Sequence, residues 1–113
     1  MDETITLAHE RLSAAFRQIG YALGETTGVI DGVTVHDRTG RYVFAWQKNP
    51  HHLLFYLRLP ALQAKSTLRQ KALGRHPEGQ VNKNPAGETT ITLYSDGEAE
   101  LLLAWLLPML PLP

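Results

Sequence analysis

The sequence of 113 residues contains no cysteine. This absence excludes disulfide bonds, thiolate zinc ligands and a cysteine nucleophile within the chain. It is typical of a reducing compartment, so we expect a cytoplasmic location. The N-terminal stretch carries Asp2, Glu3 and Glu10, which are foreign to a secretory signal peptide. The longest apolar run, Leu101 to Leu107, is shorter than the roughly 20 residues of a membrane-spanning helix, and we expect no membrane crossing.

Motifs that would identify an enzyme are also missing. The phosphate-binding pattern Gly-x-x-x-x-Gly-Lys does not occur, and the spacing of Gly20 and Gly24 does not match the dinucleotide fingerprint. Ser13, Ser66 and Ser95 do not lie in a nucleophile-elbow pattern. The sequence therefore predicts a non-enzymatic protein with no catalytic residue and no cofactor.

Histidine is the remaining candidate for metal binding, and its spacing is unfavourable. His51 and His52 are neighbours on an expected strand, so their side chains would point to opposite faces. His36 and His76 are distant in sequence, and no acidic residue stands close to the pair. We expect no metal site.

A net charge of zero conceals an uneven distribution of charge. Residues 36–84 hold nine of the eleven lysines and arginines and two acidic residues, a net charge of +7. Residues 1–35 sum to −3 and residues 85–113 to −4. A basic middle of this kind attracts anions.

The hydrophobic pattern predicts a single α+β domain over residues 1–113. Apolar residues recur at helical spacing from residue 4 to residue 19, with Gly20 or Gly24 near the helix end. Alternating residues then predict strands over 29–35, 42–46 and 53–59, with a turn at 37–40.

The second half predicts two more helices and one strand. Pro60 can open a helix over residues 60–73, and the residues 74–88 that follow are rich in Gly, Pro and Asn and predict a long loop. Thr89 to Tyr94 is a β-prone fourth strand, and Ser95 with Glu98 forms a capping box for a helix that Pro108 ends. The expected order is α-β-β-β-α-β-α, a mostly antiparallel four-stranded sheet with helices on one face.

The basic helix and loop, residues 65–83, are the candidate nucleic-acid contact. Cations in this stretch can hold phosphates, and Lys65 and Arg69 are one helical turn apart. The alternative is that they form a solvated outer face. The candidate nucleic-acid-binding residues are Lys65, Arg69, Lys71, Arg75 and Lys83.

Aromatic residues interleave with the basic ones, as they do in sheet-surface nucleic-acid binders. Tyr42, Phe44 and Trp46 alternate strictly, however. Because one face of a strand must be buried, such a trio is more often core than binding platform. We favour core for all three.

The C-terminal helix is apolar all round, which favours a second function, protein interaction. One sheet face and one flanking helix cannot cover every side of it. We therefore expect, as the alternative function, a homodimeric protein-interaction domain of the chaperone, immunity or adaptor type. Its interface would include Leu102, Trp105, Leu106 and Met109. The alternative is that the helix is wedged into the core.

From Leu53 to Leu110 the pattern resembles a small uncharacterised bacterial α+β domain, found alone or after restriction-type nuclease domains. The similarity lies in the strand "HHLLFYLRLP", the short basic helix, the polar loop, the strand "ETTITLYS" and the helix "DGEAELLLAWLLPML". It implies an association with nucleic acid and assigns no residue a role. The element order is also similar to that of type III secretion chaperones, which dimerise and hold an effector segment, although these are usually acidic where this chain is basic.

Overall fold

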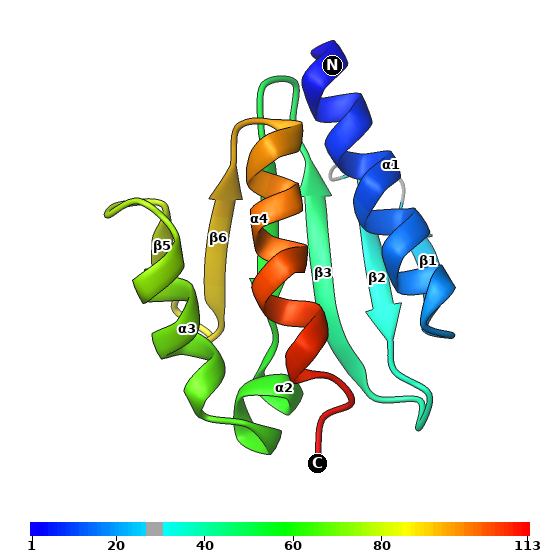
Figure 1. Ribbon diagram of the computed structural model, residues 1–113, viewed down its shortest axis with the longest axis vertical. Helices are drawn as coiled ribbons and strands as arrows, with labels where there is room; N and C mark the ends of the chain where they lie inside the picture. Colours follow the sequence, from blue (N-terminus) through cyan, green and yellow to red (C-terminus); the bar gives the residue numbers. More distant parts are fainter. Residues whose placement is uncertain (27–30) are drawn as a thin grey trace.

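A computed structural model describes residues 1–26 and 31–113. Figure 1 shows its helices and strands along the chain. In order, they are α1 (Glu3–Gln18), β1 (Ala22–Thr26), β2 (Gly32–His36), β3 (Tyr42–Lys48), β4 (Leu53–Leu57), α2 (Leu59–Ala64), α3 (Thr67–Arg75), β5 (Val81–Lys83), β6 (Thr89–Leu93), α4 (Asp96–Leu106) and the 3₁₀ helix η1 (Leu107–Met109).

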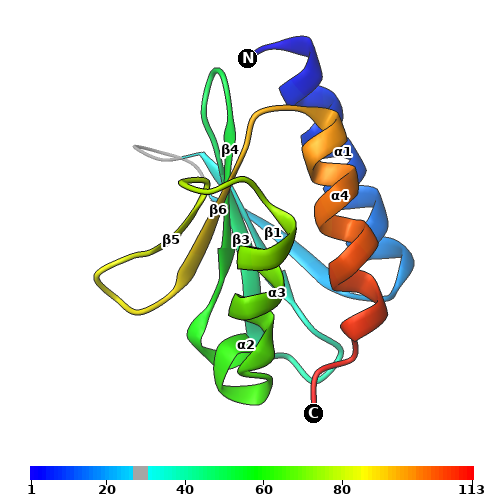
Figure 2. The ribbon, with the colours of Figure 1, turned by 60° about the vertical axis from the view of Figure 1, so that its left-hand side comes forward.

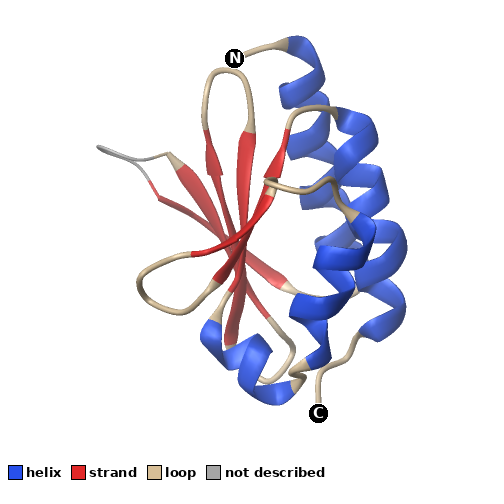
Figure 3. Cartoon of the chain, turned by 90° about the vertical axis from the view of Figure 1, so that its left-hand side faces the viewer, coloured by secondary structure: helices blue, strands red, loops and turns tan. Residues whose placement is uncertain are grey.

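The strands form one antiparallel sheet in the order β1-β2-β3-β4-β6-β5. The helices α1, α3 and α4 lie on one face of this sheet, with α4 between the other two (Figures 1 and 3). The short helix α2 contacts β3. The expected α+β class with an antiparallel sheet is confirmed, but the prediction of four strands was wrong because the sheet has six.

Two short strands were missed, one at each edge of the sheet. β1 carries the sequence ALGET, which shows no hydrophobic alternation, and β5 is three residues inside the expected loop. Each forms because its neighbour, β2 or β6, offers it a row of hydrogen-bonding groups. The strand expected to begin at Val29 begins at Gly32, and Val29 and Ile30 lie outside the described residues.

The helix expected over residues 60–73 is two helices. Lys65 has extended backbone angles, φ −147° and ψ 93°, and ends α2, while α3 starts after Ser66. Ser66 and Thr67 both favour helix starts over helix interiors. The break turns the chain, and Figure 2 shows α2 and α3 lying end to end at an angle.

The end of α1 and the start of α4 both follow signals in the sequence. α1 ends in a Schellman motif, in which Tyr21 N–H donates to Phe16 O and Gly20, at φ +84°, donates to Arg17 O. At the start of α4, Ser95 Oγ accepts a hydrogen bond from Glu98 N–H at 3.2 Å. The predicted cap is therefore present, and Glu98 Oε1 in turn accepts from Tyr94 N–H at 3.2 Å.

A bulge in the β2–β3 pair changes which side chains share a face. Val35 pairs with Phe44 but His36 pairs with Tyr42, so Val43 is the extra residue. Phe44 and Trp46 are buried under the helices as expected, whereas Tyr42 is half-buried and stacks on His36. The prediction that all three aromatic residues are core was wrong for Tyr42, because the bulge reverses the alternation there.

The core lies between the sheet and the helices. Phe16 from α1 packs on three aromatic rings of the sheet, Phe44, Trp46 and Phe55, at centroid distances of 5.5 to 6.3 Å. The buried stripe of α4 covers the neighbouring part of the sheet. This packing holds α3 and the basic residues at one side of the molecule.

Candidate functional site

We call residues 59–87 the basic segment, which runs from α2 through α3 to β5 and the turn after it. It carries five cations and one acidic residue, Glu78, a net charge of +4. Leu68 and Ala72 are fully buried and anchor α3 against the fold. The remaining sides of this helix are therefore left to solvent.

Lys71 and Arg75 share the solvent side of α3. They are one turn apart and both exposed. Together with Thr67, Gln70 and Gly74 they line a shallow hollow of about 280 Å³. A Cβ added at Gly74 would meet nothing within 4 Å, so the hollow is open at this point. An elongated anion can reach both cations here without moving the backbone.

Arg69 has a different role from the one expected of it. Its Nε donates to Thr89 Oγ1 at 2.6 Å and its Nη2 to Gly87 O at 2.8 Å. These bonds fasten α3 to the β5–β6 hairpin. Because Arg69 and Lys71 are two residues apart, they lie about 200° apart around the helix. The candidate cations therefore do not form a single row on α3.

Lys65 and Lys83 extend the basic surface beyond α3. Lys65 is half-buried at the junction of α2 and α3. Lys83 is exposed on the edge strand β5, and its register partner is Thr89, the residue that Arg69 contacts. The structure thus brings Lys83 near Arg69 and keeps Lys71 with Arg75 on the other flank of the helix.

Ion pairing distinguishes the basic segment from the rest of the chain. Outside it, three of the six cations are paired: Arg11 with Asp96 at 2.7 Å, Arg41 with Asp37 at 2.9 Å and Arg58 with Glu88 at 3.1 Å. Within the described residues, none of the five cations of the basic segment pairs with a carboxylate. Their charge remains available to a ligand.

The acidic residues gather elsewhere, on α1 and at the start of α4. The N-termini of these helices lie at the same end of the molecule (Figure 1). There Glu3, Asp96 and Glu98 occupy first helical turns, where a negative charge is favourable beside the helix dipole.

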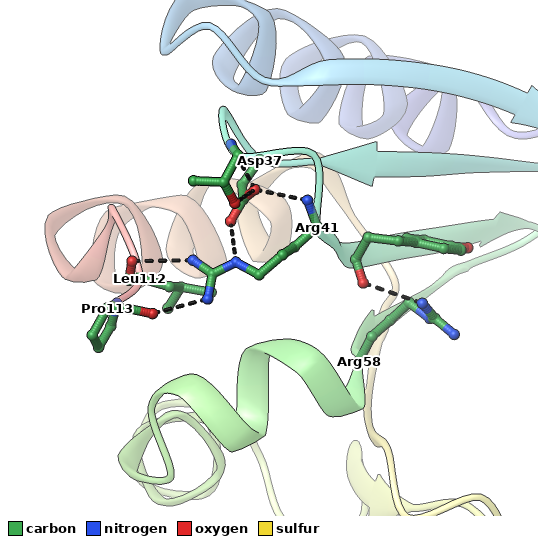
Figure 4. A network of polar contacts seen from close by, with 7 residues as sticks. Asp37, Arg41, Arg58, Leu112 and Pro113 are labelled. Atoms are coloured by element: carbon green, nitrogen blue, oxygen red, sulfur yellow. Dashed lines mark hydrogen bonds and ion pairs between the residues drawn. The ribbon is translucent and has the colours of Figure 1, made fainter.

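On the sheet face away from the helices, the ring of Tyr42 is covered by its neighbours. Arg58 Cζ lies 3.7 Å from the ring centroid of Tyr42, and His36, from the strand on the other side, stacks on Tyr42 at 5.0 Å. Arg58 Nε donates in turn to Glu88. Arg58 also donates to Tyr42 O, and Figure 4 shows this second hydrogen bond. Because neighbours cover both faces of Tyr42, a nucleobase cannot stack on it.

The C-terminal helix is part of the core. Leu102 and Leu106 are fully buried and Trp105 is 7% exposed, while Met109 is half-buried in η1. Assigning Leu102, Trp105 and Leu106 to an interface was therefore wrong. α4 lies between α1 and α3, so three neighbours cover it where the sequence suggested two. A dimer on this side would have to use other residues.

Three histidines make polar contacts within the fold. Trp46 Nε1 donates to His9 Nδ1 at 3.1 Å, and Trp105 Nε1 donates to His76 Nε2 at 2.9 Å. His51 pairs with Asp2 at 2.9 Å. The described residues contain no group of three or more His, Cys, Asp or Glu side chains that could hold a metal ion.

Comparison with protein-family models, curated proteins and solved structures finds no match to this chain. In the part of the chain that the structure describes, none of the helices has the length and apolar character required to span a membrane.

Proposed function

We propose that this chain is a non-enzymatic binding module that contacts a nucleic-acid backbone through the basic segment. The observation that carries the proposal is that the five cations of this segment have no carboxylate partner among the described residues. Phosphate contacts from Lys and Arg supply sequence-independent affinity. Since contacts to phosphate carry no information about the bases, the contact would discriminate little between base sequences.

Four cations are the expected phosphate contacts: Lys65, Lys71, Arg75 and Lys83. Arg69 is omitted because its guanidinium already holds Thr89 and Gly87. For duplex DNA, the logarithm of the binding constant falls with the logarithm of salt by about 0.9 per neutralised phosphate. Four contacts would weaken binding on the order of a hundredfold between roughly 50 and 200 mM salt.

The test is a salt titration of binding to a fluorescent DNA duplex, followed by anisotropy. Lys71→Gln with Arg75→Gln should flatten the salt slope by about two units, because each removes one phosphate contact. The matched control is Arg17→Gln with Lys48→Gln, which changes the net charge equally. Arg17 lines a hollow shared with Glu10 and Glu25, so it is a poor phosphate contact.

Two results would contradict the proposal. One is the absence of binding at low salt. The other is a slope that changes as much in the control as in the Lys71 and Arg75 variant, since general charge rather than the basic segment would then govern binding.

A further inference from the structure

Outside the basic segment, a cavity of about 480 Å³ has no role in the proposed function. It lies where three parts of the chain meet: the end of α1, the β2–β3 turn and the chain after α4. Ligand cavities in proteins commonly have volumes of about 300 to 1,000 Å³. The cavity is therefore large enough for a small organic molecule.

One side of the cavity is apolar. Ile19, Leu107 and Leu110 line it, and each is half-buried and packed against the core. Their remaining exposed surface faces a hollow rather than a flat surface. Covering that surface with an aliphatic chain would remove apolar area from water, at about 25 cal/mol for each Å².

The other side carries Arg38. Its side chain runs along Gly20, since a Cβ added there would lie 3.5 Å from Arg38 Nε. Within the described residues, the guanidinium makes neither a side-chain hydrogen bond nor an ion pair. Its five N–H donors are thus available to a planar acceptor such as a carboxylate.

Arg41 belongs to the same turn, but its guanidinium is engaged in hydrogen bonds through all three nitrogens, unlike that of Arg38. Arg41 Nε donates to Asp37 at 2.9 Å, and its two terminal nitrogens donate to Pro113 O at 2.8 Å and Leu112 O at 3.2 Å (Figure 4). Arg41 therefore holds Leu112 and Pro113 against the turn. Arg38 lines the cavity and has no carboxylate partner among the described residues.

A second unpaired group borders the same cavity. Tyr21 lines it, is 5% exposed, and has a hydroxyl that is buried without a hydrogen-bond partner in the described residues. An unpaired buried hydroxyl costs free energy that a bound acceptor or water can recover.

We propose that this cavity binds a small amphipathic carboxylate, with its aliphatic chain against Ile19, Leu107 and Leu110 and its carboxylate on Arg38. Because the cavity offers a single free guanidinium beside apolar side chains, it favours a ligand with one negative charge and an apolar body. The site is separate from the basic segment and does not depend on nucleic-acid binding.

Octanoate is the probe, added to the ¹⁵N-labelled protein and followed by NMR chemical shifts. Octanoate should shift the backbone amides of residues 19–21, 38, 107 and 110, and octylamine should not. Arg38→Gln should weaken octanoate binding about tenfold, and the charge-matched control Lys48→Gln should leave it unchanged. Leu110→Trp, which fills the cavity and keeps Arg38, should abolish the shifts while circular dichroism confirms the fold.

The proposal is overturned if millimolar octanoate leaves these amides unshifted. It is overturned equally if octylamine or octanol binds as tightly as octanoate, or if Arg38→Gln and Lys48→Gln weaken octanoate binding to the same extent.

Discussion

Two hydrogen bonds from tryptophan indoles to histidine imidazoles make the stability of this fold depend on pH. Trp105 donates to Nε2 of His76, which is 6% exposed, and Trp46 donates to Nδ1 of His9. Each ring nitrogen must be unprotonated to accept, so each imidazole must be neutral. Burial lowers the pKa of His76, and burial followed by the charge of Lys48 lowers the pKa of His9.

The first prediction concerns His76 and acid stability. Because its pKa in the folded chain lies below the ordinary value of 6.5, the unfolded chain binds more protons below that pH. Stability is therefore complete above about pH 6.5 and falls as the pH drops below it. Urea unfolding at pH 7.5 and 5.0 should show this loss. His76→Gln, which can still accept from Trp105, should reduce the loss, and His52→Gln should not.

At the scale of elements, capping explains where α4 begins better than where α3 begins. Both follow a serine, but only Ser95 accepts a hydrogen bond through its side chain, from Glu98 N–H. Ser66, before α3, makes no side-chain cap bond. The same residue type thus stabilises one helix start and leaves the other to tertiary packing.

This contrast predicts unequal effects of the same substitution. Ser95→Ala should reduce the free energy of unfolding by about 1 kcal/mol, the usual loss for a capping side chain. Ser66→Ala removes no cap bond and should stay within about 0.5 kcal/mol of the parent protein. Urea denaturation of both variants measures the difference, and equal losses would show that the Ser95 contact does not contribute.

For the whole molecule, the decisive arrangement is α4 between α1 and α3 on the sheet (Figure 1). Leu102 is fully buried there, while the adjacent Leu101 is 37% exposed. The apolar surface that suggests self-association is therefore used within one chain.

Neighbouring leucines test this arrangement. Leu102→Ala should cost about 3 kcal/mol, as expected for a cavity in a packed core, and Leu101→Ala less than about 1 kcal/mol. The loss should be independent of protein concentration, because a dimer interface would make stability depend on it. A Leu102→Ala effect that diminishes in dilute protein would point instead to a second copy.

Much of the local structure could be predicted from the sequence, because its signals lie close together in the chain. The period of Ile5, Leu12 and Phe16 predicted α1 to within one residue at each end. Ser95 and Glu98 predicted the start of α4. Alternation predicted β2, β3, β4 and β6, since a half-buried strand repeats every two residues.

The candidate site was only partly predictable. The excess of cations in the basic segment could be predicted, because it can be counted directly in the sequence. That Arg69 would fasten α3 to Gly87 and Thr89 could not be inferred, because those residues are 18 and 20 positions away. The freedom of Arg38 beside an occupied Arg41 likewise has no local signal.

The sequence by itself determined the fold class, the periods of its longer helices and strands, and the separation of charge along the chain. Tertiary structure decided the six-stranded sheet, the bulge that turns Tyr42 outward and the burial of Trp105. It also decided which arginines form ion pairs and which do not. The physical reason is the distance along the sequence over which each interaction acts. Propensity, alternation and capping act within a few residues, whereas edge-strand pairing, burial and ion pairs depend on groups that only the folded chain brings together.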